Sequence, residues 1–160
     1  DKISKYIIFN LPEVASISSY FLMSALSNKR VRLFNEDPIS FLEDDDFDIG
    51  IFPYFGIDEL PEKSIDLFYN SCSFSEMDGK SSGHYLDIVN KCCKGYFMHD
   101  NHDENFSFLN KDGTISRNII GSELIPDMSK FKLIYKKPRV HGLPEDAFIS
   151  HYEFLYKRMP

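Results

Sequence analysis

The stretch Ile65–Met77 constrains the fold of this chain more than any other. Its first part, Ile65–Tyr69, is a short apolar run that breaks at the polar residues 70–73 and then continues with helical spacing. This pattern predicts a buried strand that carries polar side chains at its carboxyl end. Ligands of open α/β sheets bind at the carboxyl ends of the strands. The stretch therefore predicts an α/β sheet with a ligand site directly after this strand.

The length and charge of the chain limit its domain count and its partners. A chain of 160 residues is expected to form one domain around a single core. Its formal net charge of -7 would repel nucleic acid and anionic membranes, so we expect neither as a partner. The one dense basic cluster, Lys136–Arg139, is more typical of a solvated turn than of a phosphate site.

The number and spacing of the cysteines indicate the cellular compartment of the protein. Cys72, Cys92 and Cys93 form neither an even disulfide framework nor a Cys-x-x-Cys metal pair, which is typical of a reduced, cytoplasmic protein. No apolar stretch approaches the roughly 20 residues that span a bilayer, and the first residues do not resemble a signal peptide.

Strand and helix patterns alternate on the amino-terminal side of the central strand. Tyr6–Phe9 and residues 48–53 are apolar runs typical of covered strands, and residues 30–34 alternate as in a strand with one wet face. Leu11–Leu26 has apolar residues at helical spacing, and Pro12 suits its first turn. Right-handed crossovers would join these elements into one α/β sheet.

An acidic stretch follows the second predicted strand, between residues 35 and 48. It predicts a surface helical turn and an acidic loop. A calcium site is the alternative, because Asp44, Asp46 and Asp48 alternate as in an EF-hand loop. However, the glycine due next is Ile49 and the closing glutamate falls on Phe55, so the loop is favoured.

The carboxyl-terminal side begins as the same alternation and then changes character. Residues 83–93 predict a helix with Gly95 as its C-cap, and residues 96–98 predict a buried strand that ends in a polar loop. The remaining segments predict strands: a hairpin of 106–109 with 114–117, and an antiparallel pair of 131–136 with 148–156.

Two motifs resemble class I S-adenosylmethionine-dependent methyltransferases, and in particular the putative sugar O-methyltransferase group. Tyr6–Glu13, YIIFNLPE, resembles the second-strand motif of many O-methyltransferases. Ile65–Met77, IDLFYNSCSFSEM, resembles the fourth strand and following turn of the sugar group, with its Ser-Phe-x-Glu-Met signature. The resemblance covers roughly residues 3–101 by motif and the rest by topology alone.

The resemblance implies a cofactor site, from which this sequence departs at two points. It implies S-adenosylmethionine as cofactor, bound by Asn10, Leu11, Asn70 and Ser71. Asn10 stands where the family usually has an acidic residue for the ribose hydroxyls. The glycine-rich turn after the first strand has no counterpart, since no Gly-x-Gly occurs. We therefore expect residues 1–160 to be a single α/β domain of a longer methyltransferase chain whose preceding segment supplies the first strand and glycine loop.

Candidate catalytic and substrate-binding residues follow the two central strands. We predict Glu76, His99 and Asp100 as catalytic residues, and Ser73, Asn101 and His102 as substrate-binding residues. For Glu76 a capping box with Ser73 is favoured over a catalytic role.

Other interpretations of the same residues stay open. The stretch 99–103 is equally well interpreted as a polar loop, and it also offers two or three ligands to a divalent metal. Cys72 is more typical of a packed side chain than of a nucleophile.

Together these observations predict a Rossmann-like methyltransferase sheet, mainly parallel with an antiparallel carboxyl-terminal strand pair, that lacks its first strand. The expected function is O-methylation of a sugar or glycan hydroxyl, with a small-molecule or glycan acceptor as partner and a homo-oligomer allowed. The alternatives are a non-catalytic Rossmann-like scaffold domain and a metal-dependent hydrolase that uses residues 99–103.

Overall fold

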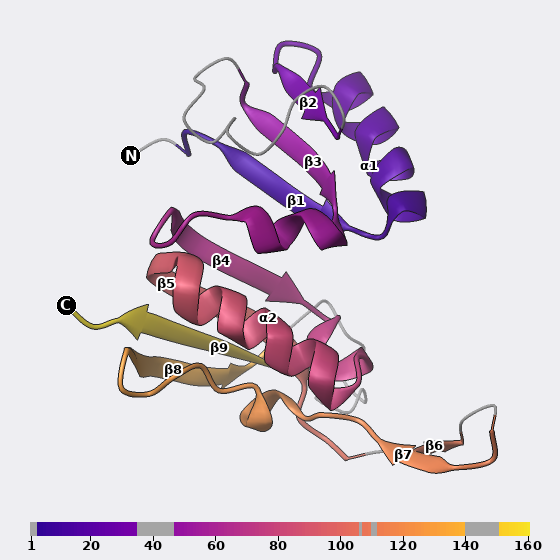
Figure 1. Ribbon diagram of the computed structural model, residues 1–160, viewed down its shortest axis with the longest axis vertical. Helices are drawn as coiled ribbons and strands as arrows, with labels where there is room; N and C mark the ends of the chain where they lie inside the picture. The colour runs from indigo at the N-terminus through magenta and orange to yellow at the C-terminus, as the bar shows by residue number, and fades with distance from the viewer. Residues whose placement is uncertain (1–2, 35–46, 106, 110–111, 140–150) are drawn as a thin grey trace. The chain divides into compact units, whose positions relative to one another are not determined.

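A computed structural model describes residues 3–34, 47–105, 107–109, 112–139 and 151–160 (Figure 1). The chain divides into two compact units, Asp1–Leu60 and Pro61–Pro160, and each is described by itself. The single-domain organisation stays a prediction. Most of the predicted acidic loop, and with it the calcium alternative, lies outside the described residues. Within the described residues no helix is long and apolar enough to cross a membrane.

The first unit is a parallel three-stranded sheet covered by one helix (Figure 1). The strand order is β1 (Tyr6–Asn10), β3 (Ile49–Pro53) and β2 (Val31–Leu33). All residues of β3 are buried, as its continuous apolar run predicts for a central strand. Helix α1 (Pro12–Ala25) has Pro12 in its first turn, which confirms the predicted start.

The second unit is a mixed four-stranded sheet with one helix. The strand order is β4 (Ile65–Ser71), β5 (Cys93–His102), β9 (His151–Arg158) and β8 (Phe131–Pro138). Strand β4 runs parallel to β5, whereas β9 is antiparallel to both of its neighbours. The predicted fold class, a Rossmann-like sheet that ends in an antiparallel strand pair, is confirmed.

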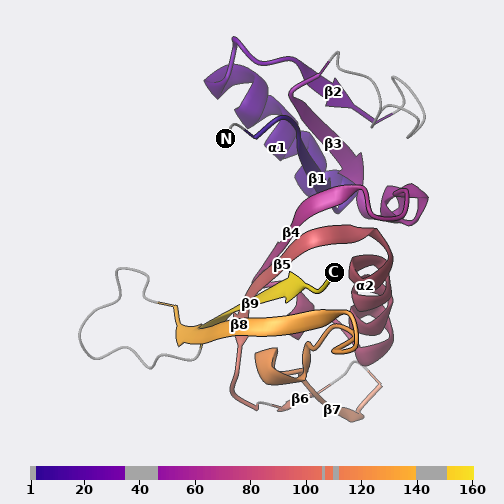
Figure 2. The same ribbon diagram turned by 90° about the vertical axis from the view of Figure 1, so that its left-hand side faces the viewer.

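Helix α2 (Gly79–Cys92) crosses between β4 and β5 and lies on one face of this sheet (Figure 2). It begins where the Asp78 carboxylate accepts hydrogen bonds from the N–H groups of Lys80 and Ser81, which is an N-cap. The core beneath it is rich in aromatic side chains. Its members are Phe74, Val89, Cys93, Phe97, Leu124, Phe131, Phe154 and Tyr156.

Alternation along β5 divides its side chains between two faces. Phe97, His99 and Asn101 are fully buried, with Phe97 in the core beneath α2. Asp100 points to the other face, together with its register partners Ser71 on β4 and Glu153 on β9. We call this second surface the far face.

Strand β5 corrects two predictions. It begins at Cys93, directly after α2, and continues to His102, so the residues predicted as a polar loop belong to the strand. Gly95 lies within the strand and is no C-cap. A Cβ atom at Gly95 would lie 2.3 Å from the backbone oxygen of Asp66, so only glycine allows the two strands to approach this closely.

The remaining strands agree with the sequence. Strands β6 (Ser107–Leu109) and β7 (Ile115–Arg117) form the predicted antiparallel hairpin, and Gly113 in its turn has a φ of 83°. Strand β9 begins at His151, and residues 148–150 of the predicted strand lie outside the described residues.

Candidate active site at the carboxyl ends of β4 and β5

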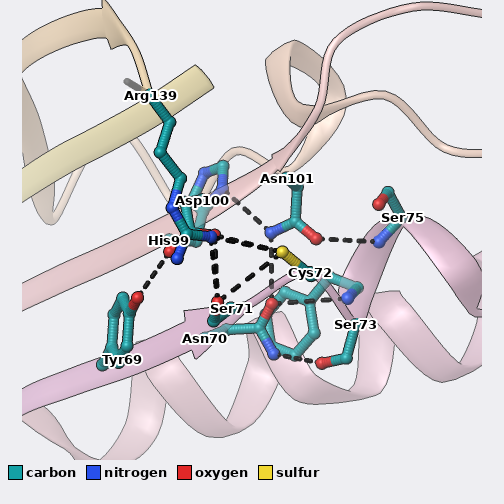
Figure 3. Close-up of polar contacts among 11 residues, drawn as sticks. Tyr69, Asn70, Ser71, Cys72, Ser73, Ser75, His99, Asp100, Asn101 and Arg139 are labelled. Carbon is teal, nitrogen blue, oxygen red and sulfur yellow. Dashed lines mark hydrogen bonds and ion pairs between the residues drawn. The ribbon is translucent and has the colours of Figure 1, made fainter. Parts of the chain in front are cut away.

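The chain turns sharply where β4 ends. Ser71, the last residue of β4, lies opposite Asp100 of β5. The next residue, Cys72, has a φ of 57°, in the left-handed region that non-glycine residues rarely adopt. Its N–H donates to the carbonyl oxygen of Asp100 at 2.8 Å, which ties the turn to the neighbouring strand. The turn therefore brings residues 71–73 next to the end of β5 (Figure 3).

The Asp100 carboxylate is the centre of a polar cluster (Figure 3). Asp100 is only 1% exposed. Its oxygens accept hydrogen bonds from Tyr69 Oη at 2.5 Å, from Ser71 Oγ at 3.0 Å and from Cys72 Sγ at 3.4 Å. The guanidinium of Arg139 completes the cluster by an ion pair. A buried carboxylate is stable only when charge and hydrogen bonds compensate its lost hydration, and these four groups supply both.

Arg139 and Tyr69 were not among the predicted site residues. The basic cluster 136–139 was predicted to be a solvated turn, but residues 136–138 belong to β8, and Lys136, Lys137 and Arg139 all form ion pairs. A sequence signal existed only for Tyr69. Side chains alternate between the two faces of a strand, so Tyr69 lies on the same face as Ser71, which follows it by two residues in β4.

Hydrogen bonds of two asparagine side chains hold the turn after β4 in place. Asn70 Oδ1 accepts hydrogen bonds from Asn101 Nδ2 at 3.1 Å and from the N–H of Phe74 at 3.3 Å. Asn101 Oδ1 accepts from the N–H of Ser75 at 3.1 Å. Asn101 is fully buried and its contacts are all within the protein, so this placement does not support the substrate contact predicted for it.

The predicted capping box of Ser73 and Glu76 is wrong. The residues Phe74–Glu76 form a single 3-10 turn, and Ser73 makes no side-chain cap. Its hydroxyl instead accepts a hydrogen bond from Asn70 Nδ2. The Glu76 side chain is exposed, and its catalytic role stays a prediction.

His99 lies inside the protein. It is fully buried, and its ring stacks on Phe154 with centroids 4.6 Å apart. Burial lowers the pKa of His99 to about 4, against smaller opposite effects of the Leu124 backbone and Asp103. The imidazole is therefore neutral at pH 7 and shielded from solvent, which does not support the catalytic role predicted for it.

The residues 99–103 do not form a joint metal site in the described structure. Because β5 is extended, His99 and Asp100 point to opposite faces. His102 lies against His151 of β9, with ring centroids 3.6 Å apart, and the Asp103 carboxylate accepts hydrogen bonds from Ser122 and Lys136. Among the described residues, no three His, Cys, Asp or Glu side chains gather in a way that could hold a metal ion.

The other two predicted cofactor residues belong to the first unit. Asn10 is the last residue of β1, and its Oδ1 accepts a hydrogen bond from the N–H of Leu11 at 2.9 Å. The Asn10 side chain is half-buried and Leu11 is exposed. Both therefore lie at the carboxyl end of a parallel strand, as the sequence predicted.

Comparisons with known proteins identify the fold alone. No protein-family model matches the chain, and no curated protein matches it. The PH0226 protein from Pyrococcus horikoshii OT3 is similar in structure, with a TM-score of 0.50, 12% identity, and coverage of 97% of this chain and 82% of that chain.

Two further solved structures belong to methyltransferases. One is the 1,6-didemethyltoxoflavin-N1-methyltransferase of Burkholderia thailandensis with bound S-adenosylhomocysteine (TM-score 0.47, 15% identity, 90% of this chain and 77% of that chain). The other is an S-adenosylmethionine dependent methyltransferase from Mesorhizobium loti (TM-score 0.44, 12% identity, 99% and 94%). The fold that this protein shares with known structures is thus the Rossmann-like α/β fold described above.

Proposed function

We propose that this protein is an S-adenosylmethionine-dependent O-methyltransferase, or the larger part of one, that acts on a sugar or glycan hydroxyl. The observation that carries the proposal is the Asp100 cluster. A carboxylate with four polar partners lies at the carboxyl ends of two adjacent parallel strands, where open α/β sheets bind their ligands. The motif resemblance of Tyr6–Glu13 and Ile65–Met77 supports the same reaction.

Each unit, considered by itself, offers polar groups at the end of a strand that suit such a cofactor. The Asn10 amide oxygen has a second lone pair besides the one used by Leu11, and it accepts a ribose hydroxyl. Asn70 and Ser71 are the last residues of β4, and Ser71 is exposed. When bound, the cofactor supplies a methyl group on a positively charged sulfur.

The remaining roles belong to the acceptor. Methyl transfer to a hydroxyl requires an in-line arrangement and a group that takes the hydroxyl proton. Asp100 is the carboxylate at the strand ends that receives this proton. Ser73 and His102 are half-buried, and they bind the acceptor together with the exposed Glu76.

We further propose that the protein works in the cytoplasm. The free thiols of Cys72, Cys92 and Cys93 support this location.

Calorimetric titration of S-adenosylhomocysteine into the natural full-length protein tests the function. Saturable binding in the micromolar range is expected, together with a rise in the melting temperature. Asn10→Ala should weaken binding roughly tenfold, which corresponds to the loss of about one hydrogen bond. Asn28→Ala, in the exposed turn after α1, is the matched control and should bind as the wild type does.

The same titration distinguishes a methyltransferase from a non-catalytic scaffold domain. A folded full-length protein that gives neither heat nor thermal shift would be a non-catalytic scaffold domain, and the uncharged Asn10 favours that second candidate. The placement of His99 and Asp100 on opposite faces of β5 does not support a metal-dependent hydrolase.

A further inference from the structure

The two oxygens of the Asp100 carboxylate have different partners. Oδ1 accepts hydrogen bonds from Ser71 and Cys72 and pairs with the Arg139 guanidinium. Oδ2 accepts a hydrogen bond from Tyr69 Oη at 2.5 Å, and it has no other hydrogen-bond partner in the part of the chain that the structure describes. The positive charge thus lies at Oδ1, whereas the contact at Oδ2 is with the neutral phenol of Tyr69.

Oδ2 is out of reach of an acceptor molecule. Asp100 is 1% exposed, whereas Tyr69 is 46% exposed. The phenol of Tyr69 therefore has one side towards solvent while its hydroxyl is bonded to the buried carboxylate (Figure 3). Ser71 is also exposed, but its hydroxyl donates to Oδ1, which already carries the guanidinium.

We propose that Tyr69 is the group that contacts the acceptor hydroxyl, and that Asp100 acts through it. This inference rests on the proposed function. As the methyl group passes from the sulfonium sulfur to the acceptor oxygen, the acceptor O–H proton moves to Tyr69 Oη. The phenolic proton of Tyr69 moves at the same time to Asp100 Oδ2. One C–S bond breaks, one C–O bond forms, and the released proton ends on the carboxylate, from which it returns to solvent.

The chain contains a matched control for this arrangement. On the far face, Tyr135 Oη donates to the carboxylate of Glu153, which also pairs with Lys137. Glu153 lies directly opposite Asp100, on β9. Tyr135→Phe therefore removes the same tyrosine-to-carboxylate hydrogen bond from a neighbouring carboxylate that has no role in the proposed relay.

The experiment measures transfer of radiolabelled methyl groups from S-adenosylmethionine to a panel of methyl hexopyranosides by the natural full-length protein. Tyr69→Phe should lower the rate at saturating substrates roughly 100-fold, as expected for loss of a proton-transfer group. Its affinity for S-adenosylhomocysteine should stay within twofold of the wild type. Tyr135→Phe should keep the rate within threefold.

A double variant distinguishes a relay from a merely structural contact. Residues that act as one unit show non-additive effects. Asp100→Asn should be about as slow as Tyr69→Phe, and the double variant should be no slower than either. Multiplied losses in the double variant, or a Tyr69→Phe rate within threefold of the wild type, would overturn the relay.

The outcomes separate the relay from the function on which it rests. A wild-type protein that binds no S-adenosylhomocysteine ends the methyltransferase proposal. A wild-type protein that binds it and methylates no member of the panel overturns the sugar acceptor and the relay together. Full activity of Tyr69→Phe overturns the relay alone.

Discussion

Asp100 and Glu153 lie opposite each other on the antiparallel strands β5 and β9. Each carboxylate is bound by one tyrosine hydroxyl and one cationic side chain. These partners are Tyr69 and Arg139 for Asp100, and Tyr135 and Lys137 for Glu153. The two sites differ in depth, since the side-chain exposure is 1% for Asp100 and 16% for Glu153. The same chemistry is thus present twice on one face of the sheet, once shielded from water and once near it.

This difference in depth predicts unequal costs for removing the two cations. Arg139→Gln leaves the Asp100 charge buried and unpaired, which should lower the free energy of unfolding by roughly 3 kcal/mol. Lys137→Gln should have a much smaller effect, because water can hydrate Glu153. Urea unfolding of both variants measures the difference, and equal losses would contradict it. Adding Asp100→Asn to Arg139→Gln should recover part of the lost stability.

Two glycines of the second unit predict opposite effects of the same substitution. A Cβ atom at Gly83 in α2 would meet nothing within 4 Å, so Gly83→Ala should raise the free energy of unfolding by about 0.5–1 kcal/mol. At Gly95 the Cβ atom would meet backbone of Asp66, and Gly95→Ala should cost about 2 kcal/mol or more. Thermal unfolding of the two variants checks the signs. A neutral Gly95→Ala would show that β4 and β5 can separate at little cost.

The sequence predicted the fold well where local patterns decide it. Apolar runs located β1, β3 and β4, and Pro12 located the start of α1. The prediction failed where pairing with residues distant in the sequence decides the structure. Residues 99–101 look like a polar loop, yet they form a strand because β9, about fifty residues later, pairs with them. The polar groups of the Asp100 and Asn101 side chains are satisfied by partners that no local pattern reveals.

The site shows the same contrast between residues that local patterns predict and residues that depend on distant partners. Ser71 and Asp100 could be predicted, because the end of a strand in an α/β sheet is a known place for ligands. Arg139 could not, since its pairing with Asp100 depends on the return of β8 to the sheet. The Ser73–Glu76 spacing predicted a capping box, but Asn70 reaches the Ser73 hydroxyl instead.

The buried amide network predicts a contrast between two neighbouring polar side chains. Asn101→Leu keeps the branching of the side chain but leaves the N–H of Ser75 without its acceptor, which should cost roughly 2 kcal/mol. Ser75 Oγ is buried and has no hydrogen-bond partner among the described residues. Ser75→Ala should therefore be neutral or slightly stabilising. Urea unfolding measures both, and a large loss in Ser75→Ala would mean that a bound water satisfies its hydroxyl.

His99 predicts how stability depends on pH. Its pKa is about 4 in the folded protein and about 6.5 in the unfolded chain. Between these values the unfolded chain binds a proton that the native protein excludes, so a fall in pH favours unfolding. The stability that depends on a neutral His99 is present in full above pH 6.5 and is lost progressively as the pH falls towards 4. From pH 7 to pH 5 the loss due to His99 should be about 2 kcal/mol.

The variant His99→Phe isolates this loss from that of the carboxylates. It keeps an aromatic ring against Phe154 but cannot take up a proton. Urea unfolding at pH 8, 7, 6 and 5 should give parallel curves for wild type and variant between pH 8 and 7, because His99 is then neutral in both states. Below pH 7 the wild type should lose stability more steeply. If the two curves stay parallel down to pH 5, the native protein accommodates a charged imidazole, and His99 regains its place as a candidate base.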